Sequence, residues 1–345
     1  MTFVLSLAVG LWLLGAMMKT PTSARWLMIG LVYVGVLAAS LIFPDGHPIR
    51  LMLGGSSGEW LIVGILAGVV WLYSQGLAML RARVRPENQP KAEGLISDEA
   101  PSSGEIERNS RHILLREIGG PGQARLKAAK VLVVGAGGLG SPILQYLGGA
   151  GVGTIGVIDH DVVEASNLQR QIIHTDARTG MPKVFSAEAA IKAQNPFLTV
   201  RPYHRKLDAE IAEDLFRDYD LVLDGCDDDD TRYLVNATTQ KVGIPLVFGA
   251  LSQWEGQVAV FQPGGPCYNC LFPTRNAPGT APTCAEGGVL SVLPGVIGSI
   301  MAAEAVKLIT GAGQPLKGLL IYDALWGETR TVAFEKDPDC KVRRR

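Results

Sequence analysis

The first 80 residues contain three apolar runs without a single charged side chain. The runs cover residues 2–18, 26–43 and 60–80, and polar or Pro/Gly-rich segments separate them. A helix needs roughly 17–25 apolar residues to cross the hydrocarbon core of a bilayer, and each run is that long. Trp26 and Trp60 open the second and third runs, and indole rings favour the membrane interface. The pattern predicts three transmembrane helices in an anchor that covers residues 1–80.

Basic residues in the loops predict how the anchor is oriented. Lys19 and Arg25 follow the first run, and the third run is followed by Arg81, Arg83 and Arg85. Basic loops favour the cytoplasm, so we expect an outside N-terminus, a multi-pass protein of the inner cell membrane, and a cytoplasmic body. A buried core helix or, for the first run, a cleaved signal peptide is the alternative. A signal peptide needs a basic start, which is missing here.

Composition changes sharply after the anchor. Five charged residues lie in residues 1–80 and the other sixty in 81–345, so the mean hydropathy of +0.20 comes largely from the anchor. Residues 81–107 have the polar, Pro/Ser/Glu-rich composition of a flexible linker, and 108–345 form the globular body. The formal net charge of −1 argues against a broadly basic nucleic-acid binder.

A glycine-rich turn marks the start of the body's fold. An apolar strand at 131–134 leads into Gly-Ala-Gly-Gly-Leu-Gly, a helical stretch follows, and a second strand at 154–159 ends in Asp159. Gly135, Gly137 and Gly140 satisfy the spacing of a phosphate-binding turn, in which backbone N–H groups at a helix N-terminus hold a phosphate. Asp159 stands where a ribose-binding acid is expected. The sequence therefore predicts a nucleotide-binding unit.

Later segments continue the alternation of strands and helices. Strands are expected at 220–224, 244–250, 257–261 and 319–324, and helices at 231–242 and 296–310. The prediction is an α/β body with a mostly parallel, Rossmann-like sheet and some antiparallel C-terminal strands.

Polar residues after Asp159 indicate what the nucleotide is used for. They are Asn167, Arg170, Gln171 and Lys183. Cations beside a phosphate-binding turn suit phosphates that react, whereas an NAD-dependent oxidoreductase, the alternative, needs little cationic charge near the transferred hydride. Four consecutive carboxylates, Asp227 to Asp230, follow the strand at 220–224 and suggest Mg²⁺. A solvated acidic helix start is the other explanation for Asp229 and Asp230.

Motifs along the whole body resemble the ThiF/MoeB/HesA family, which is related to the ubiquitin-activating enzymes. They include RNSRHILL at 108–115, GAGGLGS at 135–141, DHDVVEASNLQRQ at 159–171, CYNC at 267–270 and TCAEGGV at 283–289. The resemblance implies a homodimer that uses ATP and Mg²⁺ to adenylate the C-terminal glycine of a ubiquitin-like sulfur-carrier protein. Such carriers usually serve molybdopterin or thiamine synthesis. A tRNA base or a peptide as acceptor, and a non-catalytic module that recruits a ubiquitin-like protein to the membrane, remain alternatives.

The resemblance also assigns roles to individual residues. It places Gly138 in the turn under the nucleotide and Asp159 on the ribose. Asn167, Arg170 and Lys183 match residues that hold and neutralise the phosphates. Asp227 matches the Mg²⁺-linked carboxylate, and the neighbouring family Asn is replaced by Asp228. Arg111 matches an arginine that reaches the ATP of the other protomer.

The cysteines form a second set of candidates. Cys267 and Cys270 have the two-residue spacing of a tetrahedral zinc site. The family carries a second such pair near the C-terminus, where this chain has Cys340 in the first position and Arg343 in the second. Three thiolates with a nearby Asp or water could hold zinc, or the site is lost. Cys284 matches a cysteine that forms a covalent thioester or persulfide in some relatives and is dispensable for adenylation in others.

Overall fold

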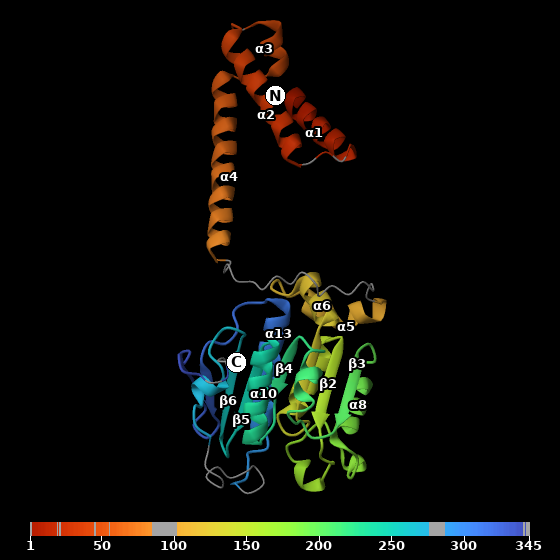
Figure 1. Ribbon diagram of the computed structural model, residues 1–345. Coiled ribbons are helices and arrows are strands. Elements are labelled where there is room, and N and C mark those ends of the chain that lie inside the picture. The colour runs from red at the N-terminus through yellow and green to blue at the C-terminus, as the bar shows by residue number, and fades with distance from the viewer. Residues whose placement is uncertain are drawn as a thin grey trace. The chain divides into compact units, whose positions relative to one another are not determined.

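The computed structural model consists of two units, Met1–Gln89 and Pro90–Arg345, and each is described by itself. The structure describes residues 2–18, 20, 22–44, 46–54, 56–84, 102–275, 287–340 and 342 (Figure 1). The predicted boundaries at 80/81 and 107/108 stay predictions, and most of the linker lies outside the described residues.

The N-terminal unit consists of four helices. They are α1 (Thr2–Met17), α2 (Thr22–Ile42), α3 (Pro48–Leu53) and α4 (Ser57–Val84). The short helix α3 was not predicted; it begins at Pro48, and the side chain of His47 accepts a hydrogen bond from the amide of Ile49. A small core of Val4, Val36 and Trp60 joins α1, α2 and α4. The hydroxyl of Tyr33 donates to the carbonyl of Trp60 at 2.7 Å and fixes α2 against α4.

Many described side chains of α1, α2 and α4 are apolar and exposed, as Leu31 and Ile65 are at 64% each. By length and composition, two helices of the described chain could cross a membrane: 24–42 within α2, and α13 (Leu293–Thr310). The second is 56% buried and is a core helix of the other unit. Shorter apolar stretches occupy 6–17 in α1 and 57–73 in α4. The three transmembrane spans therefore stay a prediction.

The C-terminal unit contains an eight-stranded sheet in the order β3-β2-β1-β4-β5-β6-β7-β8. The strands are β1 (Lys130–Val134), β2 (Thr154–Asp159), β3 (Thr199–His204), β4 (Leu221–Asp224), β5 (Leu246–Leu251), β6 (Glu255–Phe261), β7 (Leu319–Asp323) and β8 (Glu328–Val332). Strands β1 to β5 pair in parallel, and β5 to β8 pair antiparallel. The predicted Rossmann-like α/β class of the body is confirmed.

Helices cover both faces of this sheet (Figure 1). One core packs α7 (Gly140–Ala150), α8 (Lys183–Gln194) and α13 against the sheet, and the other packs α9 (Ala212–Phe216), α10 (Asp229–Val242) and α11 (Tyr268–Leu271). Helices α5 (Ser103–Ile113) and α6 (Gly119–Ala128) precede β1. Two short turns of 3-10 helix, Ala165–Asn167 and Asp176–Arg178, lie between β2 and α8.

The topology creates a crevice at the carboxyl ends of β1 and β4. Strand β1 pairs with β2 on one side and with β4 on the other, and the register aligns Val134 with both Ile158 and Asp224. After β1 the chain enters α7 on one face, and after β4 it enters α10 on the other. Because the two connections diverge, ligands of such sheets bind at this switch point.

Candidate nucleotide site

The turn after β1 needs its glycines because the backbone folds closely on itself. Gly135 has φ +92°, which side chains rarely tolerate, and a Cβ there would lie 3.1 Å from the carbonyl oxygen of Gly225. A Cβ on Gly140 would overlap the carbonyl oxygen of Gly135. Asp159 braces the turn: its Oδ2 accepts from the amide of Ala136 at 2.8 Å, and its Oδ1 accepts from the amide of Asp161 at 2.8 Å. Asp159, which is predicted to bind the ribose, thus also holds the glycine turn in place.

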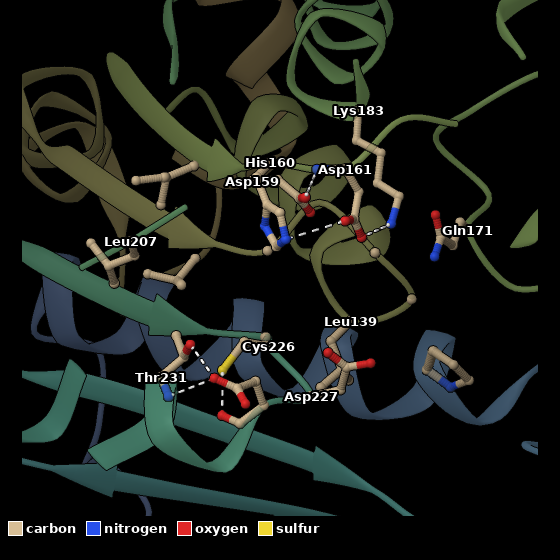
Figure 2. A pocket seen from close by; sticks show the side chains of 18 of the residues that line it. Leu139, Asp159, His160, Asp161, Gln171, Lys183, Leu207, Cys226, Asp227 and Thr231 are labelled. Carbon is tan, nitrogen blue, oxygen red and sulfur yellow. Dashed lines mark hydrogen bonds and ion pairs between the residues drawn. The ribbon is translucent and has the colours of Figure 1, made fainter. Parts of the chain in front are cut away.

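A cavity of about 310 Å³ opens at this edge of the sheet (Figure 2). Nine residues predicted for the site line it: Gly135, Gly137, Gly138, Asp159, Arg170, Gln171, Lys183, Asp227 and Asp228. In Figure 2, Lys183 and Asp161 lie on one side of the cavity and Asp227 on the other. The structure therefore brings together predicted residues that are up to 93 positions apart in the sequence, from Gly135 to Asp228.

Two cations of the cavity are held by neighbouring side chains. Lys183 begins α8 and is 5% exposed, and its Nζ lies 2.8 Å from Oδ2 of Asp161. Burial raises the pKa of Asp161, but the hydrogen bond and charge of Lys183 outweigh burial and hold that pKa below its usual value. Arg170 donates from Nη2 to Oδ1 of Asn167 at 2.8 Å. Asn167 therefore acts on the cavity through Arg170, although it does not line the cavity itself.

The carboxylates on the opposite side of the cavity differ in their hydrogen bonds and ion pairs. Asp228 caps α10: its Oδ2 accepts from the amide of Thr231 at 2.9 Å and from its hydroxyl at 2.6 Å. Burial raises the pKa of Asp228. The two hydrogen bonds from Thr231 and the positive charge of Lys206 have the larger, opposite effect, so the pKa of Asp228 lies below its usual value. Asp230 pairs with Arg275. Asp227 is exposed, and no hydrogen bond or ion pair engages its side chain within the described part of the chain.

Buried polar groups behind the glycine turn complete the site. His174 is 5% exposed; its Nε2 lies 2.8 Å from the carbonyl oxygen of Ala136 and its Nδ1 lies 2.9 Å from the Ser186 hydroxyl. Burial lowers the pKa of His174, so the ring is neutral at pH 7 and its Nε2–H donates to Ala136. Gln171 is 4% exposed and lines the cavity, and its Oε1 has no hydrogen-bond partner among the described residues. That acceptor is available to a ligand.

The buried Asp224 and the partly buried Arg232 interact by charge near the carboxyl end of β4. Asp224 is 1% exposed, and burial raises its pKa. Arg232 donates from Nη2 to the carbonyl of Cys226 at 3.0 Å and packs over the ring of Phe248. Burial raises the pKa of the Cys226 thiol well above its usual value, so this thiol is a poor nucleophile.

Three described residues that were predicted for the site, Arg111, Gly140 and Asn167, do not line the cavity. Arg111 is exposed on α5, and Gly140 acts through the shape of the turn. Cys284 lies outside the described residues, as does Arg343. The cavity also contains residues that sequence reasoning missed, namely His160 and the charged Asp161, Arg205, Lys206 and Arg232. His160 and Asp161 follow β2 and could have been found from the rule that sites form at the carboxyl ends of parallel strands.

The predicted thiol cluster forms away from the cavity. Sγ of Cys267 lies 3.7 Å from Sγ of Cys270 and 3.5 Å from Sγ of Cys340, although Cys340 is 73 positions further along the chain. The three sulfur atoms all lie within 4.8 Å of one another, as do ligand atoms of Asp159, His160 and Asp161 in the cavity.

Comparisons with known proteins agree with this geometry. The family model described as the ThiF family matches residues 109–342. A sulfur carrier protein adenylyltransferase of Thermus thermophilus is 50% identical over 245 residues, which cover 69% of this chain and 90% of the relative. A SAMP-activating enzyme E1 of Haloferax volcanii is 48% identical over 239 residues, covering 69% and 88%. The crystal structure of E. coli MccB with ATP has the same fold, with a TM-score of 0.58, 22% identity, and coverage of 72% and 76%.

Proposed function

The chain belongs to the ThiF family, and from this premise we propose that it is an adenylyltransferase that acts on a ubiquitin-like sulfur-carrier protein. The reaction joins the C-terminal glycine carboxylate of the carrier to the α-phosphate of ATP and releases pyrophosphate. The relatives at about 50% identity, which are named for sulfur-carrier adenylation and for E1 activity, support this substrate class.

One observation supports the proposal most strongly. The cations Lys183 and Arg170 and the unpaired carboxylate of Asp227 line one cavity beside the glycine turn. The carboxylate nucleophile and the α-phosphate are both anionic, so their approach is repulsive unless positive charge is placed where negative charge grows. Lys183 and Arg170 supply that charge from fixed positions, because Asp161 and Asn167 hold them. Arg205 and Lys206 line the same cavity and add to its positive potential.

Magnesium is the metal we propose for this cavity. Carboxylates and phosphate oxygens are its usual ligands, and bound Mg²⁺ neutralises charge on the leaving pyrophosphate. Asp227 fits best, since Asp228 caps α10, Asp161 pairs with Lys183, and both oxygens of Asp159 accept backbone N–H groups. Among these four acids, only Asp227 has a carboxylate without a hydrogen bond or ion pair in the described structure.

The buried Oε1 of Gln171 supports nucleotide binding independently of charge. A buried acceptor without a partner is unfavourable by about 1–3 kcal/mol, so such groups usually meet a ligand or water. Gln171 lies beside the turn, with its Nε2 within 3.5 Å of where a Cβ on Gly137 would be. A hydrogen-bond donor of the nucleotide satisfies this acceptor.

We propose that the chain forms a homodimer in which Arg111 of one protomer reaches the ATP of the other. Its side chain is exposed on α5 and does not line the cavity of its own chain. An arginine in that position acts on a partner's ATP, as the family resemblance implies.

The N-terminal unit fits a membrane anchor with three spans. Its helices expose apolar side chains along α1, α2 and α4, which water disfavours and lipid does not. With the N-terminus outside, the adenylation unit is cytoplasmic. Alkaline carbonate extraction of membranes tests this: the full chain is expected in the pellet, and release into the supernatant contradicts an integral anchor.

Pyrophosphate exchange into ATP tests the reaction directly. With a carrier protein ending in Gly-Gly, the full-length chain is expected to catalyse carrier-dependent exchange. Arg170→Ala or Asp227→Ala is expected to remove transition-state stabilisation of about 2.7–4 kcal/mol, which is roughly a hundredfold to a thousandfold in rate. Arg201→Ala and Asp214→Ala, at surface positions outside the cavity, are the matched controls.

Full exchange by both cavity variants would overturn the site assignment. Exchange without a carrier but with a peptide or tRNA would redirect the proposal to another acceptor. Thermal stabilisation by NAD and not by ATP would favour an oxidoreductase, and no stabilisation by either would favour a recruitment module.

A further inference from the structure

A second pocket lies beside helix α5, apart from the nucleotide cavity. We call it the α5 pocket; it has a volume of about 290 Å³ and lies between α5, α6 and the loops that follow α7 and α8. None of its lining residues also lines the nucleotide cavity. Its apolar side chains are Ile106, Ile113, Ala124, Phe197 and Leu198. The proposed adenylation reaction makes no use of this pocket.

Hydrogen bonds between distant segments hold the walls of the α5 pocket in place. Arg108 on α5 donates from Nη1 to the carbonyl of Gln194 at 2.8 Å, and its guanidinium lies over the ring of Phe197. Gln123 on α6 donates from Nε2 to the carbonyl of Ala150 at 2.9 Å. The walls are therefore fixed by contacts on both sides of the pocket and not by side chains that fill it.

The charged groups of the α5 pocket neutralise each other. Nζ of Lys127 lies 3.0 Å from the carboxylate of Glu105, whose side chain is 13% exposed. Burial raises the pKa of Glu105, but hydrogen bonds from Ser102 and Lys127 outweigh burial and hold that pKa below its usual value. The pair is therefore ionised and has no net charge. A neutral ligand fits this pocket better than an ion, which would be buried without a partner.

One buried acceptor on the lining of the α5 pocket has no partner. Gln123 is 8% exposed, and its Oε1 makes no hydrogen bond within the described part of the chain. Asn195, another lining residue, uses both ends of its amide: Nδ2 donates to the carbonyl of Gly148 at 2.8 Å, and Oδ1 accepts from the amide of Phe197 at 3.1 Å. A buried acceptor without a partner is unfavourable, so Gln123 is the group that a bound molecule would satisfy.

Water is a poor occupant of such a pocket. A buried water makes about three hydrogen bonds, and among the described lining residues Gln123 alone has a buried side-chain acceptor without a partner. An apolar molecule with one N–H or O–H group satisfies this acceptor and also covers Ile106, Ile113 and Phe197. An apolar cavity of about 150 Å³ holds one benzene ring, so the α5 pocket, at about 290 Å³, suits two fused rings.

We propose that the α5 pocket is a binding site for a neutral, fused-ring aromatic molecule that donates one hydrogen bond to Oε1 of Gln123. The site goes beyond the proposed adenylation and does not depend on it. Bound ligand adds contacts between α5 and the rest of the C-terminal unit, because Ile106 and Ile113 belong to α5 whereas Phe197 and Leu198 do not. The ligand therefore stabilises the position of α5.

Indole and indene test the site, because the two molecules have nearly the same shape and indole alone has a ring N–H group. The full-length protein is studied in lipid nanodiscs without ATP or carrier, and NMR follows the methyl signals of Ile106 and Ile113 during titration with each probe. Both signals are expected to shift and to saturate, while the signal of Ile244, outside the pocket, stays constant. The hydrogen bond is expected to make indole bind roughly twofold to tenfold more tightly than indene.

Two variants isolate the contact with Gln123. Gln123→Met removes the acceptor and nearly keeps the length of the side chain, so this variant is expected to bind indole and indene equally. Gln145→Met changes a glutamine of α7 outside the pocket, and this matched control is expected to keep the preference for indole. Because both probes enter lipid, their free concentrations are measured in parallel with empty nanodiscs.

Three outcomes would overturn the proposal. If neither probe gives a saturable shift at Ile106 and Ile113, the pocket takes no such ligand. Equal affinity of the wild type for indole and indene means that Gln123 makes no hydrogen bond to the ligand, a result that stands even if Gln123→Met does not fold. Nuclear Overhauser contacts of Ile106 with another protein segment in the probe-free sample mean that protein already fills the pocket. None of these readouts depends on adenylation, so they are separate from the outcome of pyrophosphate exchange.

Discussion

Acidification should destabilise this protein through one buried imidazole. His174 is 5% exposed and bridges the glycine turn, at the carbonyl of Ala136, and α8, at the hydroxyl of Ser186. Burial holds its pKa in the folded state below the value of about 6.5 that we take for the unfolded chain. The folded state therefore releases a proton that the unfolded state keeps.

The sign and size follow from proton linkage. Well above pH 6.5 neither state binds the proton, and His174 makes no pH-dependent contribution. Below pH 6.5 the unfolded chain gains a proton that the folded chain does not, so the free energy of unfolding decreases by up to about 1.4 kcal/mol per pH unit. The decrease stops when the pH reaches the folded pKa. Between pH 7.5 and 5.5 the loss is at most about 1.4 kcal/mol, or roughly 3–6 °C in melting temperature.

Thermal unfolding of the wild type and of His174→Gln at the two pH values measures this effect. Glutamine keeps a hydrogen-bonding amide and does not titrate, so the variant starts less stable but loses less on acidification. His204→Gln, which changes an exposed imidazole on β3, is the control and should follow the wild type. Equal losses in the wild type and in His174→Gln would refute the assignment of a neutral, buried imidazole.

Three further substitutions test the cavity. Asp161→Asn should lower the free energy of unfolding of the ligand-free protein by about 1–2 kcal/mol, which is less than for a fully buried ion pair because Asp161 is half exposed. Bound ATP should reduce this loss, because its phosphates give Lys183 another anionic partner. Equal melting shifts with and without ATP would contradict this. Gly140→Ala should abolish stabilisation by ATP, because its Cβ overlaps the Gly135 carbonyl, whereas Gly120→Ala on α6 meets open space and should retain it. Asn167→Ala should lower kcat/KM in pyrophosphate exchange by roughly tenfold to a hundredfold, since it frees Arg170; an unchanged value removes Asn167 from the site.

The glycine turn and its acid were predictable because their constraints are local. Gly135, Gly137 and Gly140 lie within six residues, and the strand that ends in Asp159 follows directly. The parallel sheet followed from buried apolar strands such as β1 and β4. In each case the pattern of neighbouring residues already determines the structure, so no long-range contact had to be known.

Strand β3 was missed, and two cavity cations were missed with it. Its sequence, Thr-Val-Arg-Pro-Tyr-His, contains Arg201 and Pro202, because it lies at an edge of the sheet and is only partly buried. An edge strand lacks the apolar run that identifies a central one, and proline is tolerated there. Without the strand, Arg205 and Lys206 could not be placed at the carboxyl edge of the sheet.

Partners that depend on tertiary contacts were also out of reach. The sequence gives no sign that Asp161, rather than a neighbouring acid, holds Lys183. His174 lies behind the glycine turn because its two hydrogen bonds reach groups that are 38 and 12 positions away in the sequence. Such pairings depend on how α8 packs on the sheet, which no local pattern specifies.

The distance along the chain between Cys267 and Cys340 has a consequence for the unfolded state. A metal that joins them closes a loop of 73 residues, which contains α13, β7 and β8. By the relation used for disulfide cross-links, closing a loop of this length lowers the conformational entropy of the unfolded chain by an amount equal to about 4 kcal/mol. If a metal joins the two thiolates, its loss enlarges the unfolded ensemble and lowers the free energy of unfolding of the C-terminal unit, although the five parallel strands lie outside the bridged loop.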